Sequence, residues 1–122
     1  MTTKIYRGTS LTQLAKLDKG KLYEGTSLAQ IARIDANRVF RDTGLTQILN
    51  VKGTQVFQGT SLTQLARIEN GRIYQSTSLT QIAAIKAGKI TQGTTLEQIG
   101  RIEGPCTIPE LAAILHIIFG IL

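Results

Sequence analysis

A single 17-residue unit is repeated six times without insertion or deletion, and this fixed period constrains the fold more than any other feature. The copies span residues 4–20, 21–37, 38–54, 55–71, 72–88 and 89–105. Some positions carry the same residue in every copy, among them the glutamines Gln13, Gln30, Gln47, Gln64, Gln81 and Gln98 and the threonines Thr9, Thr26, Thr43, Thr60, Thr77 and Thr94. A constant period indicates that each unit forms one supersecondary element that packs on its neighbours. We therefore expect residues 1–122 to form a single repeat domain.

Two strands joined by a tight turn account best for the unit. Asn70-Gly71 has the composition of a type I′ turn, which needs a positive φ at both central residues. The same two places are taken by Lys19-Gly20, Ala36-Asn37 and Ala87-Gly88. Such turns set an acid opposite a base in three copies: Asp18 with Lys21, Asp35 with Arg38, and Glu69 with Arg72. Each facing pair of opposite charges stabilises a strand ladder by roughly 0.2–1 kcal/mol.

The same register sets long cations opposite aromatic rings. The predicted partners are Lys16 with Tyr23, Arg33 with Phe40, and Arg67 with Tyr74. Where Thr91 replaces the ring, the facing residue is Ala84, whereas Asn50 opposite Phe57 departs from the pattern. Cationic side chains can lie on aromatic faces, and a strand–helix unit would have no reason to link these positions. The pairing favours hairpins.

A strand followed by a short helix is the alternative interpretation of the unit. Leu11, Leu14, Ala15 and Leu17 would lie on one arc of a helix, and Ser10-x-x-Gln13 has the form of a capping box. The form recurs at Ser27–Gln30, Ser61–Gln64 and Ser78–Gln81. This alternative predicts a short-repeat α/β solenoid of horseshoe shape.

Six hairpins provide twelve strands, and a flat sheet of that size would expose two edges and much apolar surface. Closure into an antiparallel twelve-stranded barrel removes both problems. A C-terminal helix over residues 107–119 can fill the interior, since the segment is apolar on almost every side from Leu111 onward. Thr107 and Glu110 would cap this helix, and Gly120 would end it. The segment is shorter than an ordinary membrane-spanning helix.

The expected order of elements, hairpins from Lys4 to Gly104 followed by a hydrophobic helix from Thr107 to Leu122, resembles the tubby-like barrel. LURP-one-related and scramblase proteins share that architecture. The resemblance implies binding of phosphoinositide headgroups, or association with a membrane through a basic outer patch. It assigns no binding residue in this chain.

Charge and cysteine content limit the possible partners and the cellular location. Fourteen Lys and Arg against eight Asp and Glu give a net charge of +6, which suits an acidic partner such as an anionic membrane surface. The lone Cys106 excludes an intrachain disulfide, and the first residues lack the apolar run of a signal peptide. These features predict a cytoplasmic protein, with association to a membrane surface as an option.

The sequence offers little catalytic chemistry. His116 lies among apolar residues and is interpreted as a satisfied or helix-end histidine, while Cys106 is interpreted as a small buried residue at the helix entry. Most carboxylates face cations beside turns, and no phosphate loop, metal-ligand cluster or nucleophile elbow occurs. We expect neither an enzyme nor a bound metal or cofactor.

Two recurrent features are candidate binding elements. The glutamine series would form a polar ring at one end of the hairpins, able to bind a sugar or headgroup, although glutamines also commonly satisfy turn backbone. Basic residues would line the outer wall among aromatic rings: Lys16, Lys21, Arg33, Arg38, Arg67, Arg72, Lys89 and Arg101. Single-stranded nucleic acid uses such surfaces, but is the less favoured partner because the rings are covered by cations.

Together these features predict a non-catalytic structural or interaction module that binds a protein partner or a second copy through its repeat surface. A membrane-surface or phosphoinositide-binding protein is the second hypothesis. A lectin-like protein with equivalent rim sites is the third. Leu14 and its equivalents do not fit strict strand alternation, and a bulge near Gly8 or burial on self-association would explain them.

Overall fold

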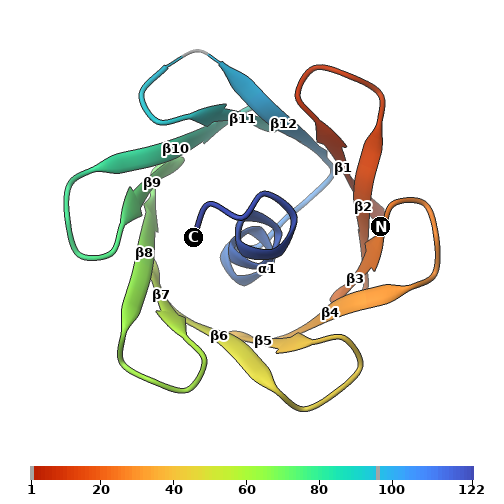
Figure 1. The fold of residues 1–122 in the computed structure, drawn as a ribbon, viewed down its shortest axis with the longest axis horizontal. Helices are drawn as coiled ribbons and strands as arrows, with labels where there is room; N and C mark the ends of the chain where they lie inside the picture. The colour runs from red at the N-terminus through yellow and green to blue at the C-terminus, as the bar shows by residue number, and fades with distance from the viewer. Residues whose placement is uncertain (1, 96) are drawn as a thin grey trace.

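The computed structural model describes residues 2–95 and 97–122, with backbone only for Thr2, and shows a closed barrel of twelve antiparallel strands (Figure 1). The strands follow the predicted hairpins: β1 (Thr2–Arg7), β2 (Gln13–Asp18), β3 (Lys21–Glu24), β4 (Gln30–Asp35), β5 (Arg38–Arg41), β6 (Gln47–Lys52), β7 (Gln55–Gln58), β8 (Gln64–Glu69), β9 (Arg72–Gln75), β10 (Gln81–Lys86), β11 (Lys89–Gln92) and β12 (Gln98–Glu103). Each strand pairs with its sequence neighbours, and β1 pairs with β12 to close the ring. The predicted fold class is therefore confirmed.

The register of the hairpins is the predicted one. Asp18 faces Lys21, Asp35 faces Arg38 and Glu69 faces Arg72. The cation–ring partners also face one another, with Lys16 Nζ 5.2 Å from the Tyr23 ring centre and the Arg33 and Arg67 guanidiniums 4.3 and 4.5 Å from Phe40 and Tyr74. At the seam, Arg101 lies 4.4 Å from the ring centre of Tyr6. The last repeat thus pairs with the first by the same rule that joins β2 to β3.

The alternative strand–helix unit is wrong. In the loop between β1 and β2, the Ser10 hydroxyl donates to the Arg7 carbonyl at 2.8 Å and accepts from the Thr12 amide at 3.2 Å. The serine closes a turn and does not cap a helix, and Gln13 begins a strand. Because the residue types that cap helices also stabilise turns, the Ser-x-x-Gln pattern alone cannot distinguish the two.

A β-bulge explains the leucines that break strand alternation. Between β1 and β2, Ile5 faces Ala15 but Tyr6 faces Gln13, so Leu14 is the extra residue. The shift recurs at Ile31, Ile48, Leu65, Ile82 and Ile99. These side chains are half-buried and pack against the core. The bulge therefore lies in the even-numbered strands and not at Gly8.

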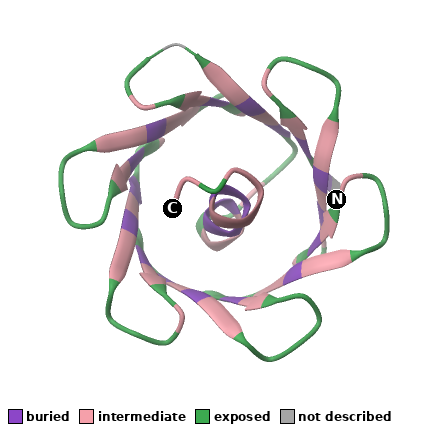
Figure 2. Ribbon diagram, in the orientation of Figure 1, coloured by how far each residue is buried: buried purple, intermediate pink, exposed green. Residues whose placement is uncertain are grey.

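The C-terminal segment is helical inside the barrel, as predicted, but changes type halfway (Figures 1 and 2). Helix α1 spans Ile108–Ala113 and continues as a π-helix, Ile114–Ile118. Thr107 and Glu110 form the predicted capping box, in which the Thr107 amide donates to Glu110 at 2.8 Å. Leu111 to Leu115 are buried against an inner wall of residues such as Ile5, Leu22 and Ile73. Helix and wall together form the hydrophobic core.

The helix enters at the end of the barrel that carries the tight turns and runs toward the end that carries the longer loops. At its start, the Thr3 hydroxyl donates to the Pro105 carbonyl at 2.6 Å, and Cys106 and Glu110 line one hollow with Lys19 and Gly20. At the other end, the Phe119 ring lies against Gly100, which faces Arg7 across the seam. The five preceding repeats carry Ala or Leu at this place. Glycine provides the space for the ring.

Candidate binding surfaces

Five leucines lie almost fully in solvent on equivalent loops. Each loop joins an odd-numbered strand to the next even-numbered one, so all of them lie at one end of the barrel, and they project outward from the wall (Figure 1). The exposed fractions are 82% for Leu11, 80% for Leu28, 84% for Leu45, 80% for Leu62 and 80% for Leu79. Leu96 is their equivalent in the last repeat but lies outside the described residues. We call this end, residues 7–12, 24–29, 41–46, 58–63, 75–80 and 92–97, the loop end.

Further apolar side chains lie near the same end. Because the helix runs toward the loops, Ile117, Ile118 and Phe119 come after its buried part, followed by Ile121 and Leu122. All five are half-buried and pack on the core. Single exposed leucines are ordinary on protein surfaces. An equivalent leucine on each of five loops, beside a half-buried apolar segment, is the kind of surface that marks an interaction site.

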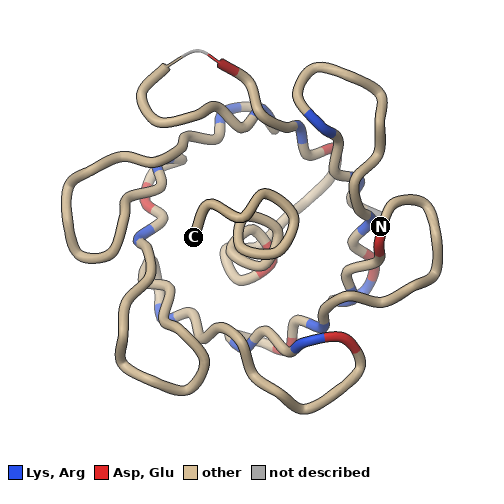
Figure 3. Tube along the Cα trace, viewed as in Figure 1, with Lys and Arg blue, Asp and Glu red and all other residues tan. Residues whose placement is uncertain are grey.

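Charge is distributed unevenly between the loop end and the rest of the barrel. The loop end contains two cations, Arg7 and Arg41, and three acids, Glu24, Asp42 and Glu97, for a net charge of −1. Since the net charge of the whole chain is +6, the remainder of the chain carries a net charge of +7. Figure 3 shows the loops largely free of charge and the Lys and Arg residues gathered on the wall. A partner without strong charge suits the loop end, and an anionic one suits the wall.

The glutamine series stabilises the loops. In all six copies the side-chain amide donates to a carbonyl at the start of a neighbouring loop: Gln13 to Gly25, Gln30 to Asp42, Gln47 to Gly59, Gln64 to Ser76, Gln81 to Gly93 and Gln98 to Gly8, at 2.7–3.0 Å. Each bond joins one repeat to the next, and the bond from Gln98 to Gly8 closes the ring. Binding of a sugar by these glutamines, as in a lectin-like protein, stays a prediction. The side-chain NH₂ groups already donate to the loop carbonyls.

The basic wall residues fall into two groups. Lys16, Arg33, Arg67 and Arg101 are half-buried and lie over aromatic rings, whereas Lys21, Arg38, Arg72 and Lys89 begin odd-numbered strands and are exposed. Two ion pairs run along strands, with Arg33 Nη1 3.9 Å from Asp35 and Arg101 Nη2 3.3 Å from Glu103. The cations of the first group therefore cover the rings that a base would need for stacking.

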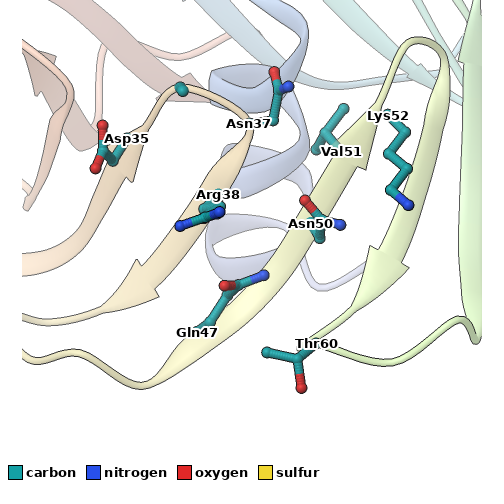
Figure 4. Close-up of a pocket in the computed structure, with 9 residues that line it drawn as sticks. Asp35, Asn37, Arg38, Gln47, Asn50, Val51, Lys52 and Thr60 are labelled. Carbon is teal, nitrogen blue, oxygen red and sulfur yellow. The ribbon is translucent and has the colours of Figure 1, made fainter.

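Two grooves open on the wall where this covering is interrupted. The first, of about 500 Å³, includes Asn50, the residue that replaces a cation opposite Phe57. Figure 4 shows Arg38, Gln47, Asn50 and Thr60 around it, with Asp35 and Lys52 at its margins. Lys52 instead approaches the Phe57 ring, at 5.8 Å. The lining combines both signs of charge with amides and a hydroxyl, which suits a neutral polar ligand.

The second groove crosses β10, β11 and β12 and has a volume of about 550 Å³. Ala84 and Thr91 form part of it, in the places that a cation and a ring take in other repeats. Its remaining lining is Gln81, Lys86, Ala87, Lys89, Thr94, Thr95 and Gln98. None of these nine described residues is acidic. The sequence indicates both grooves, since Asn50 and Ala84 replace the Lys or Arg that the other repeats have at the same position.

His116 and Cys106 lie in the helical segment. His116 is half-buried in the last turn of the helical segment, as the helix-end interpretation predicts. Its Nδ1 has no hydrogen-bond partner among the described residues, so the alternative of a satisfied histidine is wrong. Cys106 is half-buried at the helix entry, where its thiol lies 3.6 Å from the Thr107 carbonyl. In the part of the chain that the structure describes, no three His, Cys, Asp or Glu side chains are grouped to hold a metal ion.

Cys106 is expected to react slowly with alkylating reagents at neutral pH. Desolvation, and secondly the Glu110 carboxylate, raise the pKa of this thiol to about 12, and only the thiolate is strongly nucleophilic. The rate of alkylation by iodoacetamide should therefore be low at pH 8 and increase continuously with pH, without levelling off below about 12. In 6 M guanidinium the rate should match that of a small-molecule thiol, and fast alkylation of the native protein at pH 8 would contradict the burial.

Comparison with known families, with curated proteins and with solved structures found no match to the chain. The resemblance to tubby-like barrels therefore stays a prediction based on the order of elements. Among the described residues, no helix has both the length and the apolar character needed to cross a bilayer.

Proposed function

We propose that this protein is a non-catalytic interaction module that associates with a second copy of itself through the loop end. The observation that carries the proposal is the set of leucines on equivalent loops, each at least 80% exposed. An exposed leucine that recurs at the same loop position adds nothing to the barrel core. It would bury apolar surface in a contact between molecules, where each fully buried side chain contributes about 1.5–3 kcal/mol.

Charge favours a second copy over other occupants of the loop end. Two barrels that meet wall to wall would each present cations, whereas two loop ends carry a net charge of only −1 each. The loops are also arranged around the barrel axis, so a two-fold axis perpendicular to it brings one ring of leucines against the other. Contacts related by such an axis are self-complementary and close into a dimer.

The test is the mass of the intact protein in solution. The wild-type chain, of 13.3 kDa, should sediment at about twice that mass, and replacing Leu11, Leu28, Leu45, Leu62 and Leu79 together by Ser should give the monomer. The far-UV circular dichroism of this variant should be unchanged, because the leucines lie outside the core. High salt should not dissociate the dimer, since the contact is apolar.

A matched variant separates the loop end from the wall. Lys21→Ser, Arg38→Ser and Arg72→Ser together alter exposed wall positions and should leave the dimer intact. Loss of the dimer in this variant, with retention in the leucine variant, would assign the contact to the wall and overturn the proposal. A monomeric wild type that sediments with neutral vesicles, and loses this binding when the leucines are replaced, would instead support the membrane-surface hypothesis.

A further inference from the structure

One hairpin places two cations opposite each other across its tight turn. The facing residues at this place are Asp18 and Lys21, Asp35 and Arg38, Lys52 and Gln55, and Glu69 and Arg72 in the first four tight-turn hairpins. In the fifth, Lys86 faces Lys89. Like charges directly opposite one another destabilise a ladder. Comparison with the other hairpins shows that the fold does not require two cations at this place. The facing lysines are therefore an arrangement that folding alone does not favour.

The neighbours of this pair do not neutralise it. Across the next strand pairing, Lys89 faces Arg101, another cation. Glu103, two residues further along β12, pairs with Arg101 at 3.3 Å, and Arg101 itself lies over the Tyr6 ring. On the other side of β10, Arg72 faces Ala84 and lies opposite Glu69 in its own hairpin. Positive charge consequently accumulates over β10 and β11.

The second wall groove begins at these two lysines. Lys86 and Lys89 line it together with Gln81, Thr91, Thr94, Thr95 and Gln98. The Thr95 hydroxyl already donates to the Gln92 carbonyl at 2.6 Å, so the donors considered for an anion are the two lysines, Thr91 and Thr94. Ala84 and Thr91 leave it open because neither reaches across the wall as the cation and ring of other repeats do. Ammonium groups and hydroxyls are hydrogen-bond donors of the kind that bind phosphate and sulfate oxygens.

We infer that the groove across β10–β12 binds a phosphate or sulfate monoester, with the anionic group between Lys86 and Lys89 and the remainder of the ligand along Thr91, Thr94 and Thr95. The anion supplies the negative charge that Asp18, Asp35 or Glu69 supplies in other hairpins. The first groove, in contrast, contains Asp35 among its lining and lacks this excess of cations. The anion site is therefore specific to one tight-turn hairpin, at the junction of the fifth and sixth repeats.

The experiment is a titration of the intact, isotopically labelled protein with inorganic phosphate at constant ionic strength, followed by amide chemical shifts. The shifts of Ala84, Lys89 and Thr91 should change and saturate, and the melting temperature should rise with phosphate. In Lys86→Glu, which restores the arrangement of Glu69 and Arg72, both responses should be lost. Without phosphate this variant should melt at a higher temperature than the wild type, because like charges no longer face each other.

Lys19→Glu is the control, since it changes the net charge by the same amount on an exposed turn outside the groove. It should retain the wild-type response to phosphate. Linear shifts without saturation, or an equal loss of response in both variants, would show only general screening and would overturn the inference. Lys86 and Lys89 lie on the wall, but Thr94 and Thr95 belong to the loop end, so the titration is also made with the variant in which the five loop leucines are replaced by Ser. This variant keeps every residue that lines the groove and should give the same response to phosphate.

Two further probes distinguish the source of the anion. Neutral vesicles with and without a phosphoinositide test a lipid headgroup, and a soluble sugar phosphate tests a free ligand. Sedimentation with phosphoinositide vesicles that Lys86→Glu abolishes would assign the site to a headgroup. Saturable shifts with the sugar phosphate, without sedimentation, would assign it to a soluble ester, and both results support the groove as the site.

Discussion

A chain that ends at Pro105 is expected not to fold into the barrel. The missing segment supplies Leu111, Ile114 and Leu115, which are at most 5% exposed, and burial of three such side chains contributes roughly 5–9 kcal/mol. That amount is comparable with the entire stability of a typical domain, about 5–15 kcal/mol. The inner wall would also become exposed to water. Circular dichroism and denaturant unfolding of the shortened chain should show loss of strand signal and of any cooperative transition.

A charge placed inside the barrel tests the same contact in the full-length chain. Leu115→Asp buries a carboxylate with no cationic partner and should lower the free energy of unfolding by more than about 4 kcal/mol. Leu62→Asp, on a loop, is the control and should change it by less than about 0.5 kcal/mol at a protein concentration that keeps the chain monomeric. A shortened chain that unfolds cooperatively with an unchanged strand signal would show that the segment is not needed to fill the barrel.

Gly71→Ala is expected to destabilise the barrel strongly, although it adds only a single methyl group to a tight turn. Gly71 has φ of +77°, and a Cβ added there would lie 2.6 Å from the Ile85 carbonyl oxygen. That oxygen belongs to the neighbouring hairpin, and the Ile85 amide donates to the Gly71 carbonyl at 2.7 Å. A strained backbone costs about 1–3 kcal/mol, and the contact adds to this cost because the two hairpins must separate. Thermal and urea unfolding measure the loss.

Gly53→Ala is the matched control for this prediction. Gly53 also has a positive φ, +60°, but a Cβ added there would meet no atom within 4 Å. Alanine occupies the equivalent place in two other turns, as Ala36 and Ala87, with φ of 54° and 52°. The change should therefore cost less than about 1 kcal/mol. Equal losses for the two variants would mean that positive φ alone, and not the contact with Ile85, determines the effect.

Contacts across a tight turn could be predicted from the sequence because they involve residues a few positions apart. The pairs Asp18–Lys21 and Lys16–Tyr23 follow from the turn at Lys19-Gly20 alone. The same rule, applied around the ring, yields the Arg101–Tyr6 contact at the seam. The capping box at Thr107 and Glu110 is likewise local.

The candidate binding surfaces were only partly predictable. The glutamine series was visible as a constant position, but its bonds to neighbouring loop carbonyls depend on how closely two hairpins approach. In the sequence, Leu11 had a place only on the apolar arc of the alternative strand–helix unit, and no pattern indicated that the loop leucines are exposed. Their exposure results from the direction in which the loops leave the wall (Figures 1 and 2).

By itself, the sequence determined the hairpin unit, the register and the closed barrel, because these rest on turn chemistry and on a pattern repeated six times. It also determined the buried C-terminal helix, because that segment is apolar on almost every side and begins with a capping box. Only the tertiary structure decided the bulges at Leu14 and its equivalents, the contact between Phe119 and Gly100, and the two open grooves. These features depend on distances between segments far apart in the chain. Such distances are set by how twelve strands and one helix pack together, and no local pattern records them.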